Sequence, residues 1–226
     1  MDAFNWGALN RAWPYLLDGM ATTAMLTVVG MVLGILFGTG LAIARLFGPP
    51  WLARMARFYT DVFRSIPLIL TIFWVYFLVP YALRAITGNP NLDVGPVYAA
   101  LTAFVLAEAA YFGEIIRGGL GSVPKGQMQA AIALGMGRFT ALRLIVLPQA
   151  FRNMTPSLIN QSIGLLMDTS LVYVISLNDF LGAATKVAQR DGTVVEVYLF
   201  VALVYLAICS IGTALVAVTR RRIEQR

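Results

Sequence analysis

The sequence predicts an all-α integral membrane protein with five transmembrane helices. Its 226 residues are 59% hydrophobic and only 12% charged, and its mean hydropathy is +0.76. A soluble domain of this length needs more charge to cover its surface. The apolar residues also form long blocks, and each block can cross a hydrocarbon core of about 30 Å at 1.5 Å per residue. Lysine and arginine gather at the block ends, as membrane topology requires, so no nucleic-acid partner is expected.

The expected spans follow one another within a single domain of residues 1–226. They are placed at about 19–46, 61–83, 97–119, 154–177 and 194–219. Residues 1–18 have neither a basic start nor a small-residue cleavage site, so they are not expected to be a signal peptide. Their aromatic residues instead indicate a segment that lies at the membrane interface. Turn formers separate the spans at Gly48-Pro49-Pro50 and at Gly88-Asn89-Pro90-Asn91.

The distribution of basic residues predicts the orientation in the membrane. Thirteen lysine and arginine residues lie on the side of the first connection, the third connection and the C-terminal tail, against four on the other side. Cytoplasmic connections carry the excess of positive charge. The N-terminus is therefore expected outside and the C-terminus in the cytoplasm.

A strip of glycines in the first span predicts close helix packing. Gly30, Gly34 and Gly38 recur every four residues, which lets another helix backbone approach. Whether that helix belongs to this chain or to a partner stays open at this stage. Five spans contain no internal repeat, so a pore needs a partner subunit.

The sequence offers little for catalysis or metal binding. Histidine is absent, and the one cysteine, Cys209, lies within an apolar run. Histidine is the usual proton shuttle and a frequent metal ligand, so neither a metal site nor a histidine-based acid–base site is expected. One cysteine cannot form an internal disulfide, and Cys209 is interpreted as a small packing residue.

The connection between the third and fourth spans carries the strongest signal. It exceeds thirty residues, and long ordered loops tend to be functional. Residues 127–134 are predicted to form a short helix that ends at Gly135 in a left-handed conformation. A second short helix is expected to run to Leu147 and to stop at Pro148. Two such helices under the membrane would present a rigid knob to a cytoplasmic partner.

This connection resembles the EAA loop of ABC importer permeases. The pattern begins with Gln129-Ala130-Ala131. Gly135 follows after three further residues, and Ile145-Val146-Leu147-Pro148 follows after nine more. Gln129 stands where the family usually has glutamate, and it keeps the reach but lacks the charge. A literal Glu108-Ala109-Ala110 lacks the later spacing and is interpreted as a coincidence.

The resemblance extends along nearly the whole chain. Three further stretches are similar to the polar amino-acid branch of these permeases: Phe63-Arg64-Ser65-Ile66-Pro67-Leu68, Gly113-Glu114-Ile115-Ile116-Arg117-Gly118-Gly119 and Asp168-Thr169-Ser170-Leu171. The last stretch, together with residues 186–192, is most similar to glutamate/aspartate importer permeases. Met167 stands where members of the branch often carry a lysine.

The resemblance implies a type I ABC importer permease: one transmembrane permease domain with a coupling loop at about 120–150. The knob at 122–144 would dock on a dimer of ABC ATPase subunits, which hold ATP and magnesium. This chain lacks a Gly-rich loop followed by Lys-Ser or Lys-Thr, so the ATPase must be a separate subunit and no cofactor is expected here. The implied ATPase-coupling residues are Gln129, Ala130, Ala131, Gly135, Ile145, Leu147 and Pro148.

The resemblance also implies the other partners and the location. A second permease subunit, identical or homologous, completes the pore, and an extracytoplasmic amino-acid-binding protein delivers a polar amino acid, glutamate or aspartate in the first place. The chain is then a multi-pass protein of the bacterial cytoplasmic (inner) membrane, surrounded by lipid. It is a permease subunit and not an enzyme.

Polar residues inside the spans are candidates for the substrate pathway. A charged side chain at mid-membrane costs about 2.5–3.5 kcal/mol on insertion scales, so Asp168 should face other helices or a water-filled cavity. The candidate set is Arg64, Asn160, Gln161, Asp168, Thr169 and Ser170. Two alternatives stay open: a hydrogen-bond cluster between helices without substrate contact, and, for Arg64, a topology anchor whose head reaches water. Arg64 could also pair with Asp168 or attract substrate carboxylates.

Other polar and aromatic residues have simpler interpretations. Glu114 and Arg117 are three residues apart on a helix and are expected to pair with each other. Glu108 lies deeper in the third span and is expected to meet a polar partner. Near an outer boundary, Trp74, Tyr76 and Tyr81 are interpreted as interfacial anchors.

Two other classes of function are weighed against the permease. Asp168 and Glu108 suit an ion- or proton-coupled carrier or channel subunit, but five spans without an internal repeat and the rigid cytoplasmic knob count against it. An intramembrane enzyme would need a paired nucleophile and base, and the sequence offers no such pair.

Overall fold

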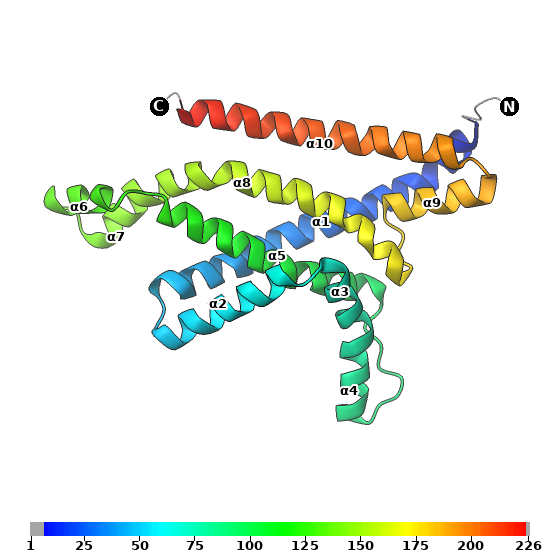
Figure 1. The fold of residues 1–226 in the computed structure, drawn as a ribbon, viewed down its shortest axis with the longest axis horizontal. Helices are drawn as coiled ribbons and strands as arrows, with labels where there is room; N and C mark the ends of the chain where they lie inside the picture. Colours follow the sequence, from blue (N-terminus) through cyan, green and yellow to red (C-terminus); the bar gives the residue numbers. More distant parts are fainter. Residues whose placement is uncertain (1–6, 225–226) are drawn as a thin grey trace.

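The structure is a computed structural model that describes residues 7–224, and in that range every regular element is helical (Figure 1). The α-helices in chain order are α1 (Gly7–Phe47), α2 (Pro50–Ser65), α3 (Leu68–Phe73), α4 (Val79–Thr87), α5 (Pro96–Gly121), α6 (Lys125–Ala133), α7 (Arg138–Ala141), α8 (Leu147–Asp168), α9 (Phe180–Asp191) and α10 (Val194–Glu224). Two π-helical turns (Trp74–Leu78 and Leu142–Val146) and one 3-10 helix (Thr169–Ile175) lie between them.

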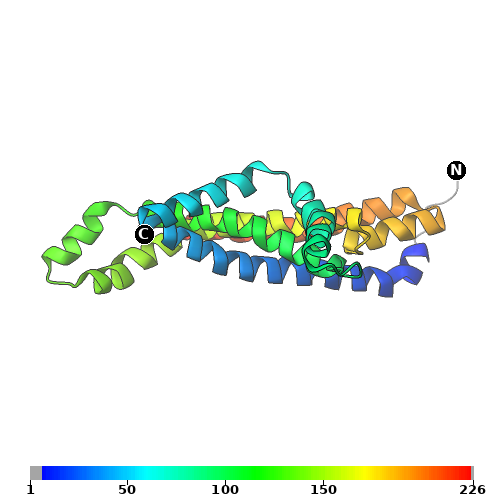
Figure 2. The same ribbon diagram turned by 90° about the horizontal axis from the view of Figure 1, so that it is seen from below.

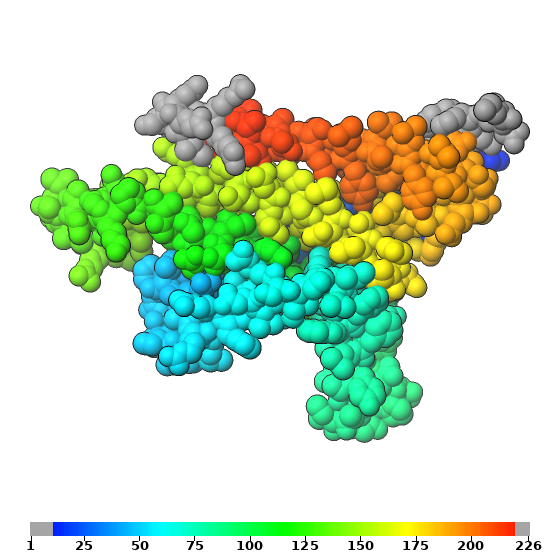
Figure 3. Space-filling model, viewed as in Figure 1, coloured from blue at the N-terminus to red at the C-terminus, as the bar shows by residue number. Residues whose placement is uncertain are grey.

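The long helices form an elongated bundle. In both ribbon views α1, α5, α8 and α10 extend along the long axis (Figures 1 and 2). The α6–α7 segment, the turn between α1 and α2 and the C-terminal end of α10 lie toward one end, whereas α9 and the start of α1 lie at the other. The arm formed by α3 and α4 projects sideways and stands clear of the body in the space-filling view (Figure 3).

The five expected membrane spans are confirmed as helices that are long and apolar enough to cross a bilayer. These candidate spans are Arg11–Phe47, Leu68–Thr87, Pro96–Gly121, Arg138–Ile175 and Val194–Thr219. The first helix already includes residues 7–18, because Ala12 and Leu16 are buried against α9 and α10. Residues 1–6 of the expected interfacial segment lie outside the described residues, so its place at the interface stays a prediction.

The second span starts later than expected because the chain breaks before it. α2 ends at Ser65, and Ile66 is extended, with φ of −100° and ψ of 130°. A residue that precedes proline avoids the helical region, and Pro67 follows here. The expected span of 61–83 therefore straddles a break, and a new helix begins at Leu68.

Pro148 does not stop the helix that leads into it, which corrects the expectation from sequence. The chain continues from α7 through the π-helical turn into α8, and the Leu147 N–H donates to the Leu142 carbonyl five residues earlier. A proline ring clashes with the carbonyl four residues before it and lacks an N–H. The wider turn relieves this conflict without ending the helix. A similar π-helical turn precedes Pro80, where the Val79 N–H donates to the Trp74 carbonyl.

The glycine strip of α1 packs against a helix of the same chain, which settles the question left open by the sequence. A Cβ at Gly34 would lie 2.8 Å from the Glu108 Cβ, and a Cβ at Gly38 would lie 2.7 Å from the Gly113 nitrogen. Both neighbours belong to α5. The two backbones are therefore in direct contact, as small residues permit in membrane helices.

Candidate functional site

The segment between α5 and α8 is built as two short helices joined by a fixed turn. The Gly135 N–H donates to the Ile132 carbonyl at 2.9 Å, and the Met136 N–H donates to the Ala131 carbonyl at 3.1 Å. These are the two hydrogen bonds of a Schellman motif, which satisfies the last carbonyls of a helix. Gly135 has a φ of +85°, the left-handed conformation that the sequence predicted and that favours glycine.

A small core holds this segment against the bundle. Val123, Val146 and Ala150 are buried together, and Met128 of α6 packs against them. Two side-chain hydrogen bonds reinforce the contact: Asn153 donates to the Ser122 hydroxyl at 2.8 Å, and Gln149 donates to the Gln127 side-chain amide oxygen, Oε1, at 3.2 Å. The segment is thus fixed at its base by α8 rather than suspended as a loose loop.

The tip of the segment exposes large apolar side chains. Leu134 is 84% exposed and Phe139 is 76% exposed, and Ile132 and Leu144 are exposed beside them. Figure 1 places α6 and α7 at the far end of the molecule, where no other element covers them. Exposed apolar clusters of this kind mark interaction surfaces.

The residues of the EAA-like pattern have different surroundings. Gln129 and Ala130 are exposed on α6, whereas Ala131 is buried. Ile145 and Leu147 are half-buried and Pro148 is exposed where the π-helical turn joins α8. The pattern therefore combines exposed positions with positions that hold the segment in place.

Glu108 lies in the centre of the bundle and meets the polar partner that the sequence called for. Its side chain is 1% exposed. The Gln161 amide of α8 donates to both carboxyl oxygens, each at 3.1 Å. This contact links α5 to α8 at the level where Gly34 of α1 touches the Glu108 Cβ. A buried polar group without a partner is costly, so the pair constrains three helices at one point.

The remaining pathway candidates are only partly brought together. Asp168 is half-buried at the end of α8, and Asn160 is exposed. Thr169 is fully buried and donates to the Leu166 carbonyl, and Ser170 donates to the Met167 carbonyl. Each hydroxyl therefore donates to a carbonyl three residues earlier in the chain.

Arg64 does not pair with Asp168. Its guanidinium lies 5.8 Å from the centre of the Tyr111 ring, and among residues 7–224 neither Arg64 nor Asp168 belongs to an ion pair. The guanidinium is exposed where α2 ends. A cation over an aromatic face is stabilised by the ring quadrupole.

Glu114 pairs with Arg117 as expected, and a second arginine joins the pair. The Arg117 guanidinium donates to the Glu114 carboxylate, and Arg45 of α1 contacts the same carboxylate at 2.5 Å. Sequence reasoning missed Arg45 because a distance of 69 residues along the chain carries no periodic signal. The cluster joins the end of α1 to α5.

A second buried acid fixes the opposite end of the molecule. Asp179 is fully buried and caps α9, where its carboxylate accepts from the Gly182 N–H at 2.8 Å and the Leu181 N–H at 3.2 Å. The next N–H, of Phe180, donates to the Thr23 hydroxyl of α1. Burial raises the pKa of the Asp179 carboxyl, and the backbone hydrogen bonds act in the opposite direction. Side-chain capping of this kind stabilises a helix start.

Similar proteins were found by sequence. The chain matches, over residues 30–225, the family described as the binding-protein-dependent transport system inner membrane component. It is 46% identical to the glutamate/aspartate import permease protein GltK of Escherichia coli O6:H1 over 223 residues, which covers 98% of this chain and 99% of that protein. It is 32% identical to the glutamine transport system permease protein GlnP of Escherichia coli K12, which covers 99% of this chain and 97% of that protein.

Similar folds were found among solved structures. An amino acid ABC transporter crystallised with histidines has a TM-score of 0.85 at 26% identity, over 98% of this chain and 100% of that chain. The MetNI methionine ABC transporter in an inward-facing conformation has a TM-score of 0.66 at 20% identity, over 97% of this chain and 99% of that chain, a likeness of fold alone.

Proposed function

Because the chain belongs to the family of binding-protein-dependent transport system inner membrane components, we propose that a separate ATPase drives it through the segment of residues 122–144. The chain is a transmembrane permease subunit of an ABC importer for amino acids. The family assignment gives no support to the ion- or proton-coupled carrier considered from the sequence.

The exposed apolar tip carries this proposal. Leu134 and Phe139 project from a segment whose turn is fixed at Gly135 and whose base is packed against α8. A rigid apolar knob can fill a groove on a partner and transmit the partner's displacement to the bundle, whereas a flexible loop would deform instead. The coupling residues Gln129, Ala130, Ala131, Gly135, Ile145, Leu147 and Pro148 belong to this knob and its base.

The path from the knob into the bundle is a continuous helix. α7, the π-helical turn and α8 follow one another without a break from Arg138 to Asp168. Displacement of the knob would therefore move α8, and Gln161 on α8 would carry the movement to Glu108 of α5. This is a rigid-body change between two packed states, with ATP binding favouring one of them.

The orientation and the partners follow from the same proposal. The knob lies toward the same end as the α1–α2 turn and the C-terminal end of α10 (Figure 1), and the connections and tail in these parts of the sequence carry most of its lysines and arginines. That end would face the cytoplasm and two ATPase subunits. A second permease subunit would complete the pore, and a binding protein would deliver substrate at the opposite end, near α9.

We propose glutamate or aspartate as the substrate, supported by the 46% identity to GltK over nearly the whole chain. The pathway would include Arg64, Asn160, Asp168 and Ser170, whose side chains are not fully buried. Gln161 and Thr169 would contribute through the helix contacts that they already make. A carboxylate at Asp168 suits the ammonium group of an amino acid, and Arg64 suits its carboxylates.

The knob is tested with the complete transporter in proteoliposomes. Leu134→Asp and Phe139→Asp should each abolish ATP-driven glutamate uptake and release the ATPase during purification, because they place a charge in an apolar contact. Thr140→Asp adds the same charge at an exposed neighbouring position and should retain the ATPase. Full uptake by both Leu134→Asp and Phe139→Asp would overturn the proposal.

The pathway is tested separately by uptake kinetics. Asp168→Asn removes the charge but keeps the shape, and it should raise the KM for glutamate several-fold while the ATPase stays bound. Unchanged kinetics in Asp168→Asn would remove this residue from the pathway without affecting the assignment of the knob.

A further inference from the structure

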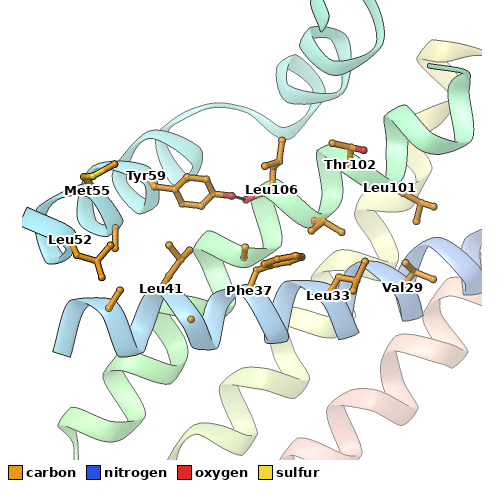
Figure 4. Close-up of a pocket in the computed structure, with 15 residues that line it drawn as sticks. Val29, Leu33, Phe37, Leu41, Leu52, Met55, Tyr59, Leu101, Thr102 and Leu106 are labelled. Carbon is orange, nitrogen blue, oxygen red and sulfur yellow. Dashed lines mark hydrogen bonds between the residues drawn. The ribbon is translucent and has the colours of Figure 1, made fainter. Parts of the chain in front are cut away.

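A long apolar groove opens on the side of the bundle, between α1, α2 and α5 (Figure 4). Its volume is about 890 Å³. The wall from α1 is one helical face that runs from Val29 through Leu33, Phe37 and Leu41 to Ala44. α2 contributes Leu52 and Met55 among others, and α5 contributes residues 101–109 in part. No function discussed above uses this groove.

The dimensions of the groove fit a lipid chain. From Val29 to Ala44 the α1 wall extends for about 22 Å at 1.5 Å per residue. Half of a hydrocarbon core of about 30 Å is about 15 Å, so the groove is long enough to hold the full length of an acyl chain from one leaflet. The wall lies in the second half of α1, so most of the groove lies on the side of the turn between α1 and α2.

The walls of the groove leave almost no polar group free. The Tyr59 hydroxyl projects toward α5 and donates to the Leu106 carbonyl at 2.7 Å, a contact visible in Figure 4. This bond closes the gap between α2 and α5 and occupies the hydroxyl. Thr102 is the other polar side chain of the wall. A water-filled groove would need more partners for its waters, so hydrocarbon is the fitting content.

Two arginines of α2 have no ion-pair partner in the described part of the chain, and one of them, Arg54, lies beside the groove. Arg54 lines a second hollow of about 520 Å³ that shares Met55 and Tyr59 with the groove. Arg57 is exposed one turn further along the same helix. In the described part of the chain neither arginine belongs to an ion pair, whereas the nearby Arg45 is already occupied by Glu114. Guanidinium groups bind phosphate in a bidentate manner.

We infer that this groove binds an anionic phospholipid, with one acyl chain between α1, α2 and α5 and the phosphate held by Arg54 and Arg57. An acyl chain gains little by moving from the bilayer into an apolar groove, so the unpaired arginines must supply the selectivity. Basic pockets between transmembrane helices recognise anionic headgroups in this way. The bound lipid would act as a wedge that supports α2 against α1 and α5.

The complete transporter is the material for the test. It is exchanged into nanodiscs that contain phosphatidylcholine with a small fraction of labelled phosphatidylglycerol, and the bound lipid is counted by native mass spectrometry. The wild type should retain phosphatidylglycerol in preference to phosphatidylcholine. The double variant Arg54→Gln/Arg57→Gln should bind it about 30-fold more weakly, since each basic residue contributes roughly fivefold.

Two further variants separate the groove from general charge. Gly40→Leu starts from an open position in the groove, because a Cβ at Gly40 meets nothing within 4 Å. It should lose the bound lipid although both arginines remain. Arg11→Gln/Lys186→Gln removes two positive charges from the opposite end of the molecule and should retain the lipid.

Equal retention of the two lipids by the wild type would overturn the inference, as would unchanged retention in both Arg54→Gln/Arg57→Gln and Gly40→Leu. Crosslinking of a Gly40→Cys variant to another permease chain would overturn it as well, because it would assign the groove to a protein contact. None of these outcomes depends on ATPase docking.

Discussion

The contact between α1 and α5 and the knob at residues 122–144 place opposite demands on the sequence. At the contact, glycines recur because backbone and side-chain atoms of α5 occupy the space where their Cβ atoms would lie. At the knob, large apolar side chains face outward, and nothing within the described chain requires them to be apolar. Folding alone therefore explains the first region, whereas the exposed apolar side chains of the second fit the proposed contact with a partner. Substitutions should damage stability in the first region and coupling in the second.

The largest effect on stability is expected at Gly38. Gly38→Ala places a Cβ 2.7 Å from the Gly113 nitrogen and 2.9 Å from the Ala109 carbonyl oxygen, so α1 and α5 must separate. Overpacking of this kind costs about 1–3 kcal/mol and occasionally more. The matched control is Gly40→Ala, two residues later in the same helix, whose Cβ meets nothing within 4 Å. Thermal unfolding in detergent should separate the two variants, and equal melting temperatures would contradict the tight contact.

The next effect concerns the link between α5 and α8. Glu108→Met leaves the Gln161 amide without its two acceptor oxygens, and an unsatisfied buried amide costs about 1–3 kcal/mol. Gln161→Met should be destabilising for the converse reason. The double variant Glu108→Met/Gln161→Met should be more stable than the sum of the two losses predicts, since it removes both polar partners. Strict additivity in this cycle would mean that the hydrogen bonds contribute nothing.

The cap of α9 gives a smaller effect that depends on pH. Asp179→Ala should lose about 0.5–2 kcal/mol because the start of α9 loses its acceptor. Asp179→Asn keeps an acceptor and removes the cost of a buried charge. Since burial raises the pKa of Asp179 in the folded protein, the carboxyl favours folding when it is protonated and loses this advantage as the pH rises through the folded pKa.

The melting temperatures of the wild type and of Asp179→Asn should therefore become more similar at low pH. Asp179→Asn is expected to melt at a higher temperature than the wild type at pH 8. The difference should shrink as the pH falls toward about 4, near the pKa of an unfolded aspartate. A difference that grows on acidification would show that the hydrogen bonds, and not burial, dominate the pKa of Asp179.

The sequence predicted what depends on composition and local pattern. The five spans follow from apolar length, the left-handed Gly135 from its place after a short helix, and the Glu114–Arg117 pair from helical spacing. The pattern of residues also predicted an ABC importer permease, which the family match confirms. These features need only a few neighbouring residues.

The features that escaped prediction depend on contacts between distant segments. Arg45 reaches Glu114 across 69 residues, and Gln161 reaches Glu108 across 53. Pro148 was expected to end a helix, but the widened turn before it lets the helix continue, and this turn has no distinct signature in the sequence. The arm of α3 and α4 likewise projects from the bundle after a break at Ile66, a position inside the predicted span of 61–83.

The smallest effect on the melting of the helix bundle, with the largest on transport, is expected at Gly135. Gly135→Val forces a β-branched residue into a φ of +85°, at a cost of about 1–3 kcal/mol that falls on the turn of the knob rather than on the bundle. Gly137→Val is the matched control, because Gly137 is extended, with φ of −65°, and a Cβ there meets nothing within 4 Å. Both variants should insert into the membrane, and both should melt at similar temperatures because the α1–α5 contact is unchanged. Only Gly135→Val should hydrolyse ATP without accumulating glutamate. If the two variants transport equally well, the fixed turn is not needed to transmit the movement of the ATPase to α8. The knob would then differ from the α1–α5 contact only in its exposure.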